Sequence, residues 1–283
     1  MYSDISRNQG VFYIAFGERY RAECVASMCS LRRYHPGLPV CVVTESPWDL
    51  EPTPEVVLIR EPIRSLRAKP TYMTCAPFTQ TLYLDTDTRI VRPIQQIFEL
   101  LTYFDIGISF RPQFLRCDPY FLPWCNSGVI VYQNNDRVQQ TFRLWLELYA
   151  ATEDGRIGRV HDDRFLPLAI ARGSARVIHL AAPLNFFLNE PQCTASPVRI
   201  IHSRNERDVA KAIESTSCWD ANRDWESRTW IPQLRSFFPS GGLRPPGIWK
   251  KDPLIGLSIL MRRANLAMDS WLENASRRLW PPP

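Results

Sequence analysis

Short apolar runs alternate with amphipathic segments through the first 150 residues of the chain. The apolar runs are rich in β-branched and aromatic residues and end at Gly, Pro or polar turns, which predicts buried strands. These strands are expected at 11–16, 40–43, 56–59, 81–84, 105–110 and 127–132. Between them, apolar residues recur every three or four positions, which predicts helices at 18–34, 64–76, 94–101 and 134–150. Strands that alternate with helices indicate an α/β layer fold with a largely parallel sheet.

The composition of the chain changes near residue 240. SGGLRPPG, at 240–247, is typical of a linker, and the residues from 256 to 280 carry an apolar stripe that predicts an amphipathic helix. We therefore expect a main domain at 1–240 and a linker with a C-terminal helix at 241–283. Trp and paired Arg residues on that helix suit an anionic membrane surface. Asp269 and Glu273 reduce its positive charge, which favours packing of its apolar stripe on the main domain or on a second copy of the chain.

Composition excludes several classes of protein. With 45% hydrophobic and 12% aromatic residues, the chain can bury a sizeable core and is not globally disordered. The net charge of +5 is too small to indicate a nucleic-acid partner, because such proteins carry a concentrated basic patch. Of the 34 basic residues only four are lysine, and arginine suits planar contacts to phosphates and carboxylates.

Cysteine usage and hydropathy indicate the compartment. The eight cysteines include no CxxC pair of the kind a zinc site needs, and several lie in apolar stretches, as buried thiols in a reducing compartment do. The first residues do not have the charged and then apolar pattern of a leader. No run approaches the roughly 18 apolar residues of a membrane span. We predict a cytoplasmic protein, with a peripheral membrane contact left open for the C-terminal helix.

Asp85-Thr86-Asp87 is the principal candidate for chemistry. It directly follows the apolar strand at 81–84, and in α/β sheets ligands gather at the carboxyl ends of strands. Two carboxylates at this spacing suit Mg²⁺ or Mn²⁺, which bridge the oxygens of a diphosphate. The alternative is a polar turn in which the aspartates cap backbone amides. Haloacid-dehalogenase-like phosphatases also place DxD after a strand, but Arg89 stands where they carry Thr or Val.

Five segments, taken in order, resemble sugar-nucleotide glycosyltransferases of the GT-A fold, especially the group of glycogenin and the bacterial lipopolysaccharide galactosyltransferases. The segments are 11–45, 67–91 with the DxD, NSGVIVY at 126–132, HDDRFLPLAI at 161–170 and VRIIHSRN at 198–205. The resemblance implies a GT-A, Rossmann-like, mixed and mostly parallel sheet flanked by helices. It also implies that 198–205 contains a late strand that supplies a histidine.

The resemblance assigns a metal site and a donor site. Asp85, Asp87 and His202 would bind Mn²⁺ or Mg²⁺, with His179 as a weaker alternative to His202. The donor would be a nucleotide sugar, with UDP favoured as the nucleotide. Its expected contacts are Ala15, Phe16, Arg67, Lys69, Asp85, Thr86, Asn126, Ser127, Gly128 and Arg204. The lysine that the family carries six residues after the histidine is replaced by Asp208, so that Arg204 or Arg207 would contact the diphosphate instead.

Asp162 and Asp163 are the candidate catalytic carboxylates. An inverting enzyme needs a carboxylate base near the attacking hydroxyl, whereas in a retaining enzyme the leaving phosphate can take the proton. The resemblance favours retention. Either aspartate equally suits an N-cap for the helix expected at 163–172. The aromatic loop 111–125 is expected to contact the acceptor, because sugars stack on aromatic rings.

The sequence therefore predicts a metal-dependent glycosyltransferase that moves a sugar from a nucleotide diphosphate to a hydroxyl of a saccharide, a lipid-linked acceptor or another molecule. Two alternatives remain open. One is an enzyme that transfers phosphoryl or nucleotidyl groups with the same aspartates, and the other is a non-catalytic module that binds a sugar nucleotide. The nucleotide base, the sugar, the acceptor, the stereochemical outcome and the oligomeric state are not indicated by any motif.

Overall fold

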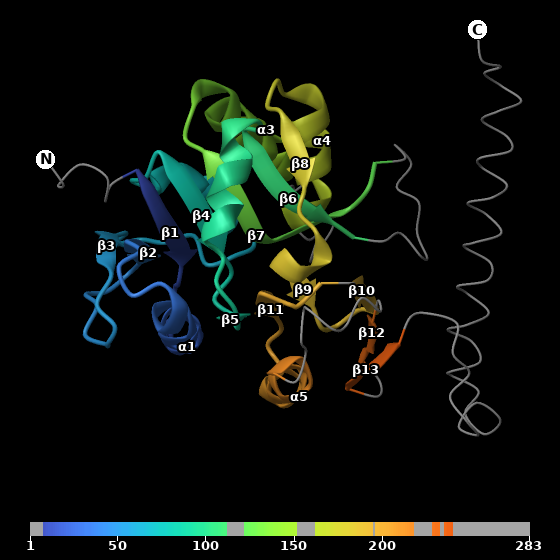
Figure 1. The fold of residues 1–283 in the computed structure, drawn as a ribbon. Coiled ribbons are helices and arrows are strands. Elements are labelled where there is room, and N and C mark those ends of the chain that lie inside the picture. Colours follow the sequence, from blue (N-terminus) through green and yellow to red (C-terminus); the bar gives the residue numbers. More distant parts are fainter. Residues whose placement is uncertain are drawn as a thin grey trace, which may run out of the picture. The chain divides into compact units, whose positions relative to one another are not determined.

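The computed structural model describes residues 8–111, 122–151, 162–194, 196–217, 228–232 and 235–239 (Figure 1). Its largest element is a seven-stranded sheet with the order β3-β2-β1-β4-β7-β6-β8. The strands are β1 (Gln9–Ile14), β2 (Val40–Thr44), β3 (Glu55–Leu58), β4 (Gln80–Leu84), β6 (Ile106–Phe110), β7 (Cys125–Gln133) and β8 (Val177–His179). Only β7 runs antiparallel to its neighbours, β4 and β6, and the other pairs are parallel. The predicted mixed, mostly parallel sheet is confirmed.

Helices cover both faces of this sheet, because its strands are apolar on both sides. Neighbouring residues such as Phe12 and Tyr13 of β1 contribute to different hydrophobic cores. The first core includes α1 (Glu18–Tyr34) and the 3-10 helix η3 (Gln95–Thr102), and the second includes α2 (Ala68–Tyr72), α3 (Asp136–Ala150) and α4 (Leu166–Arg172). Burial on both faces is the usual situation of parallel strands.

The predicted helices differ from the observed ones in three places. The helix expected at 64–76 is shortened to α2 and a 3-10 turn, η2 (Met73–Cys75), and the one expected at 94–101 is the 3-10 helix η3. The helix expected at 163–172 is divided into a 3-10 turn, η4 (Asp162–Arg164), and α4. Pro167 lies in the first turn of α4, where its missing N–H is tolerated, so a new helix begins there.

A second, three-stranded sheet was not predicted. Its strands are β5 (Thr88–Ile90), β11 (Ile200–His202) and β9 (Phe186–Phe187), with β11 in the centre. A third hydrophobic core lies beside it and includes residues of α5 (Glu206–Ser217) and β12 (Arg228–Ile231). The strands β10 (Gln192–Thr194), β12 and β13 (Ser236–Pro239) form a further small sheet. The pairing of β11 with β5 joins distant parts of the chain beside the DxD.

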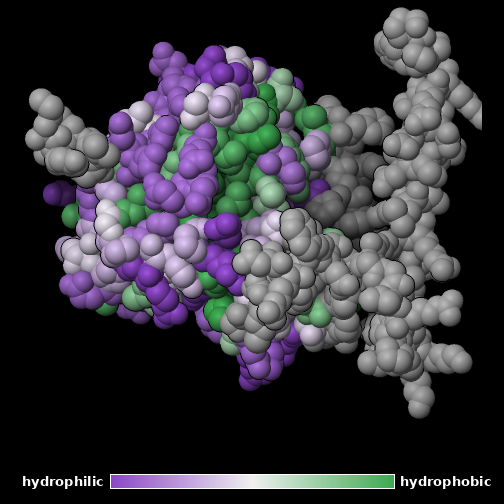
Figure 2. Space-filling view, viewed as in Figure 1, coloured by the Kyte–Doolittle hydropathy of each residue, from purple (hydrophilic) through white to green (hydrophobic). Residues whose placement is uncertain are grey.

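Several sequence predictions fall outside the described residues or are only partly covered. The C-terminal helix, most of the predicted acceptor loop and the 240/241 boundary lie outside them, so these stay predictions. In the described parts of the chain, no helix is long and apolar enough to cross a membrane. The cysteines at 24, 29, 41, 75, 125 and 193 are all free thiols. On the face shown in Figure 2, hydrophobic residues form a patch in the upper part of the view among mainly hydrophilic surface.

Candidate metal centre

The two aspartates lie in the short connection between the two sheets. Leu84 ends β4, Thr88 begins β5, and the backbone N–H of Asp85 donates to Gly128 O of β7 at 2.8 Å. On the other side, Ser203 N donates to Asp87 O at 3.0 Å, and His202 is paired in register with Thr88. The backbone therefore fixes the turn from both sheets and brings the end of β11 to the DxD.

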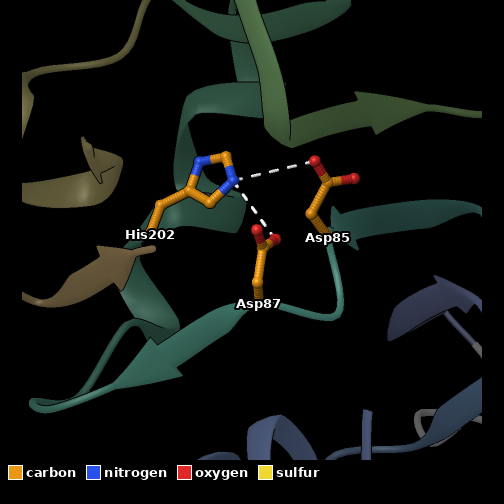
Figure 3. Close-up of side chains that lie close together, drawn as sticks. All are labelled: Asp85, Asp87 and His202. Atoms are coloured by element: carbon orange, nitrogen blue, oxygen red, sulfur yellow. Dashed lines mark ion pairs between the residues drawn. The ribbon is translucent and has the colours of Figure 1, made fainter. Parts of the chain in front are cut away.

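Asp85, Asp87 and His202 form a compact group of candidate ligands (Figure 3). One ligand atom from each side chain lies within 4.8 Å of the other two. His202 Nε2 is 3.3 Å from Asp87 Oδ1 and 3.7 Å from Asp85 Oδ2. The structure thus brings together the three side chains that the sequence motifs proposed as metal ligands.

Hydrogen bonding sets the tautomer of His202. Its Nδ1 lies 3.1 Å from Asn185 Oδ1, while Asn185 Nδ2 donates to Asn126 Oδ1 at 3.2 Å. We therefore assign the imidazole proton to Nδ1, which leaves the lone pair of Nε2 facing the two carboxylates. Lone pairs and carboxylate oxygens repel one another, so a cation or a proton is needed among them. A divalent metal would supply that cation, and the donor set fits Mn²⁺ or Mg²⁺.

Gly128 leaves the space that the imidazole occupies. A Cβ at this position would lie 2.0 Å from His202 Cε1 and 2.6 Å from Nδ1. No carbon can approach a ring atom so closely. The position of His202 thus explains the glycine in NSGV.

Basic side chains partly balance the aspartates. Lys69 Nζ lies 2.8 Å from Asp85 Oδ1 and 3.0 Å from Ser127 Oγ, and Tyr83 donates its hydroxyl to the same carboxylate at 2.6 Å. Arg204 Nε lies 3.4 Å from Asp87 Oδ2. Burial raises the pKa of Asp87, but the hydrogen bond and charge that His202 supplies in its protonated form, together with the charge of Arg204, outweigh it and hold that pKa well below its usual range. Asp87 is therefore ionised at neutral pH.

Asn126 offers a polar atom to this region. Its Oδ1 accepts from Gly128 N at 3.0 Å and from Asn185, so its Nδ2 is the free end of the amide. Nδ2 is buried and has no hydrogen-bond partner among the residues that the structure describes. A buried hydrogen-bond donor without an acceptor is energetically unfavourable, which indicates that a ligand or a water molecule accepts a hydrogen bond from Nδ2.

The remaining predicted residues lie in different surroundings. Ala15 and Phe16 directly follow β1 and belong to the cores, with Phe16 edge-on to Tyr72 at 5.2 Å. Arg67 is half-buried and directly precedes α2. Thr86 donates its hydroxyl to Glu23 Oε2 of α1 at 2.9 Å. Their predicted contacts with a nucleotide are not tested by this structure.

Of the two candidate catalytic aspartates, the structure describes the side chain of Asp163 alone. Asp163 is buried, with its Oδ2 3.3 Å from Arg111 NH2, whereas the side chain of Asp162 is outside the described part of the chain. The alternative histidine, His179, lies in β8 and accepts a hydrogen bond from Phe110 N through Nδ1. His179 is therefore hydrogen-bonded to the backbone of β6 and not to the aspartates.

Asp208, which stands in place of the expected lysine, lies 2.5 Å from Arg235 Nε.

Sequence reasoning missed several residues around the centre. Asn185, Glu23 and Tyr20 were not expected there, and Arg111 was expected only as part of the acceptor loop 111–125. Tyr20 lies 5.4 Å from the guanidinium of Arg204. No local pattern distinguishes them, because each reaches the site through contacts distant in sequence.

Comparisons with known proteins address the fold. No protein-family model and no curated protein matches the chain. A structure of the galactosyltransferase LgtC in complex with donor and acceptor sugar analogs has a TM-score of 0.51 and 14% identity, over 75% of this chain and 98% of LgtC. The apo form of the glycosyltransferase GlyE of Streptococcus pneumoniae TIGR4 has a TM-score of 0.50 and 16% identity, over 77% of this chain and 62% of GlyE, so the chain spans less than two thirds of GlyE. The chain has the GT-A fold of these glycosyltransferases.

Proposed function

We propose that this protein is a metal-dependent glycosyltransferase that moves a sugar from a nucleotide-diphosphate donor to an acceptor hydroxyl. The observation that carries the proposal is the group of Asp85, Asp87 and His202 at the end of β4, in a chain with the GT-A fold. Two carboxylates and an imidazole whose Nε2 lone pair faces them form a mixed oxygen and nitrogen site suited to Mn²⁺, with Mg²⁺ as the alternative.

The protein's own side chains would prepare this site before the donor arrives. Lys69 and Tyr83 hold the Asp85 carboxylate, and Asn185 holds the His202 ring. Asp85, Asp87 and His202 would hold the divalent metal, which would supply Lewis-acid stabilisation of the negative charge on the leaving nucleoside diphosphate. Arg204, which is half exposed beside Asp87, is the cation that we assign to the diphosphate in place of the missing lysine.

The sugar would lie beyond the diphosphate, near Asn126, Ser127 and Gly128. The partnerless Nδ2 of Asn126 is suited to a sugar hydroxyl. We assign Asp163 to the same subsite, with Asp162 as the second carboxylate, and expect retention of configuration. UDP is the favoured nucleotide, and Arg67, Thr86, Ala15 and Phe16 are its further proposed contacts. The acceptor is proposed to be a saccharide, a lipid-linked sugar or another hydroxyl compound.

A binding screen tests the function. Wild-type protein is titrated with UDP, UDP-glucose, UDP-galactose and GDP-mannose, with and without MnCl₂, by isothermal calorimetry. We expect binding of at least one nucleotide sugar that requires the metal, and loss of this binding in Asp87→Asn. Incubation with that donor should then release sugar or nucleoside diphosphate. Release of orthophosphate would favour a phosphoryl-transfer enzyme, donor binding without turnover would favour a binding module, and absence of all binding would contradict the proposal.

The compartment and the C-terminal helix form a separate part of the proposal. We place the protein in the cytoplasm, with residues 241–283 contacting a membrane surface or a second copy of the chain. Co-sedimentation of the full chain with anionic and neutral liposomes tests the membrane contact. If the same fraction of protein sediments with anionic liposomes, with neutral liposomes and without liposomes, the proposed membrane contact is wrong.

A further inference from the structure

Arg111 lies between two carboxylates at the edge of the proposed sugar subsite. Its NH2 is 3.3 Å from Asp163 Oδ2, and its NH1 is 3.4 Å from Glu190 Oε1. The guanidinium therefore contacts each acid through a different nitrogen. Its Nε is buried and has no hydrogen-bond partner within the described ranges.

The two acids need this cation to different degrees. The side chain of Asp163 is only 8% exposed, whereas that of Glu190 is 33% exposed and partly solvated. An ionised carboxylate that is buried without a partner is unfavourable, so Arg111 is more important for Asp163 than for Glu190. The trio carries one net negative charge, because one guanidinium stands against two acids.

A phenyl ring connects Arg111 to the metal centre. The guanidinium lies 5.1 Å from the ring centre of Phe187, and that ring lies 5.0 Å from the ring of His202. Phe187 is paired in register with His202 in the small sheet. Arg111 and His202 thus contact the same aromatic ring, so that Asp163 is linked to His202 by three successive contacts, through Arg111 and Phe187. An aromatic ring beside carboxylates is a typical surround for a pyranose.

We propose that Arg111 is a positioning residue that holds the Asp163 carboxylate and orients it toward a hydroxyl of the transferred sugar. This inference rests on the proposed function and specifies it: Arg111 contributes to recognition of the sugar part of the donor and not of the nucleotide part. Arg111 itself does not contact the reacting atoms. Its effect reaches the donor through Asp163.

The test compares UDP with a UDP-sugar in the presence of MnCl₂. Kd values for UDP and for UDP-glucose or UDP-galactose, whichever binds the wild type more tightly, are measured by calorimetry for wild type, Arg111→Met and Arg111→Lys. A charge-assisted hydrogen bond to the sugar corresponds to about a tenfold change in affinity. In Arg111→Met we expect the Kd for UDP to stay within about twofold and the Kd for the UDP-sugar to rise by about tenfold, with partial recovery in Arg111→Lys.

Two further variants separate positioning from damage to the fold. Arg164→Met is the matched control, because Arg164 follows Asp163 and stacks on Trp124 at 4.7 Å, and it should change neither Kd. Asp163→Asn should reproduce the selective loss, and the double variant Arg111→Met, Asp163→Asn should lose no more than either single one.

The outcomes distinguish the two proposals. A wild type that binds neither UDP nor a UDP-sugar would overturn the proposed function and this inference with it. If the wild type binds both, an unchanged ratio of the two Kd values in Arg111→Met, an equal rise in both, or additive effects in the double variant would overturn the role of Arg111 alone. If Arg111→Met does not fold, Arg111→Lys and Asp163→Asn give the same comparison.

Discussion

Gly128→Ala places a methyl group against the ring of a proposed metal ligand. The new Cβ would lie 2.0 Å from His202 Cε1, 2.6 Å from Nδ1 and 2.8 Å from Nε2. Ordinary contacts between carbon atoms are about 3.5–4.0 Å, so the imidazole has to move by about 1.5 Å. The strand holds Gly128 through the bond from Asp85 N to Gly128 O. The histidine ring is therefore the part that moves.

The displacement is large compared with the tolerance of a metal bond. Metal–ligand distances vary by only about 0.2 Å, so a ring displaced this far no longer ligates. Disturbing the support of a ligating histidine costs about 10–100-fold in metal affinity, and we expect a loss at the upper end of this range for Gly128→Ala. The crowding should also lower the free energy of unfolding by about 1–3 kcal/mol.

Two other glycines provide matched controls. A Cβ on Gly37 has no neighbour within 4 Å, so Gly37→Ala should change neither property. A Cβ on Gly10 lies 2.5 Å from the ring of Phe78, so Gly10→Ala should destabilise the fold and leave metal affinity unchanged. Mn²⁺ affinity is measured by calorimetry and unfolding by urea titration followed by tryptophan fluorescence. Wild-type Mn²⁺ affinity in Gly128→Ala would refute the assignment of His202 as a ligand.

Two further predictions concern pH and stability. Asp105 is fully buried and accepts hydrogen bonds from Asn135, Arg137 and Arg176, and although burial raises its pKa, these bonds lower it well below the usual range. Because its pKa is lower in the folded than in the unfolded state, Asp105 stabilises the fold at pH values above its unfolded-state pKa of about 4, and this stabilisation is lost as the pH falls below that value. Asp105→Asn should therefore lower the free energy of unfolding by about 1–3 kcal/mol at pH 7 and by clearly less at pH 3, as measured by urea titration. The lower half of that range is favoured, because Arg137 and Arg176 are half exposed; an equal cost at both pH values would contradict this role. His35 Nε2 accepts from Ile94 N at 2.9 Å, and burial lowers the pKa of His35. Protonation breaks this bond, so the stability that it adds is present above about pH 6.5 and lost below, and wild type should lose about 1 kcal/mol relative to His35→Gln between pH 7.5 and pH 5; parallel pH profiles would exclude the effect.

The local elements and the three residues of the candidate metal group could be predicted from the sequence, while the strand pairing that brings these residues together could not. The apolar run before Asp85 and the helical periodicity of residues 134–150 are local patterns, and the structure confirms both as β4 and α3. The small sheet depends on β11 pairing with β5, a contact between segments far apart in sequence that no window of residues reveals. The same reason explains why Asn185 was missed and why the contact of Arg111 with Asp163 was not predicted.

Side-chain partners were the least predictable part of the site. Lys69 was expected at the nucleotide phosphates, and the structure places its ammonium on Asp85 and Ser127. A lysine in a sequence indicates a charge but not its partner, because its flexible stem reaches several acceptors. The predicted role of Lys69 at the donor therefore stays a prediction beside an observed role in holding Asp85.

The pairing of β11 with β5 connects metal binding to the local unfolding of this small sheet. Asp85 and Asp87 precede β5, whereas His202 ends β11, so an ion held by all three would act as a removable cross-link between chain segments that are distant in sequence. At a free metal concentration of 100 times Kd, binding to the native state alone adds about 2.7 kcal/mol to its stability. That free energy would specifically oppose the separation of β11 from β5. Hydrogen exchange of the β11 amides should therefore slow with added Mn²⁺, and divalent cation concentration would control how often this edge of the molecule opens.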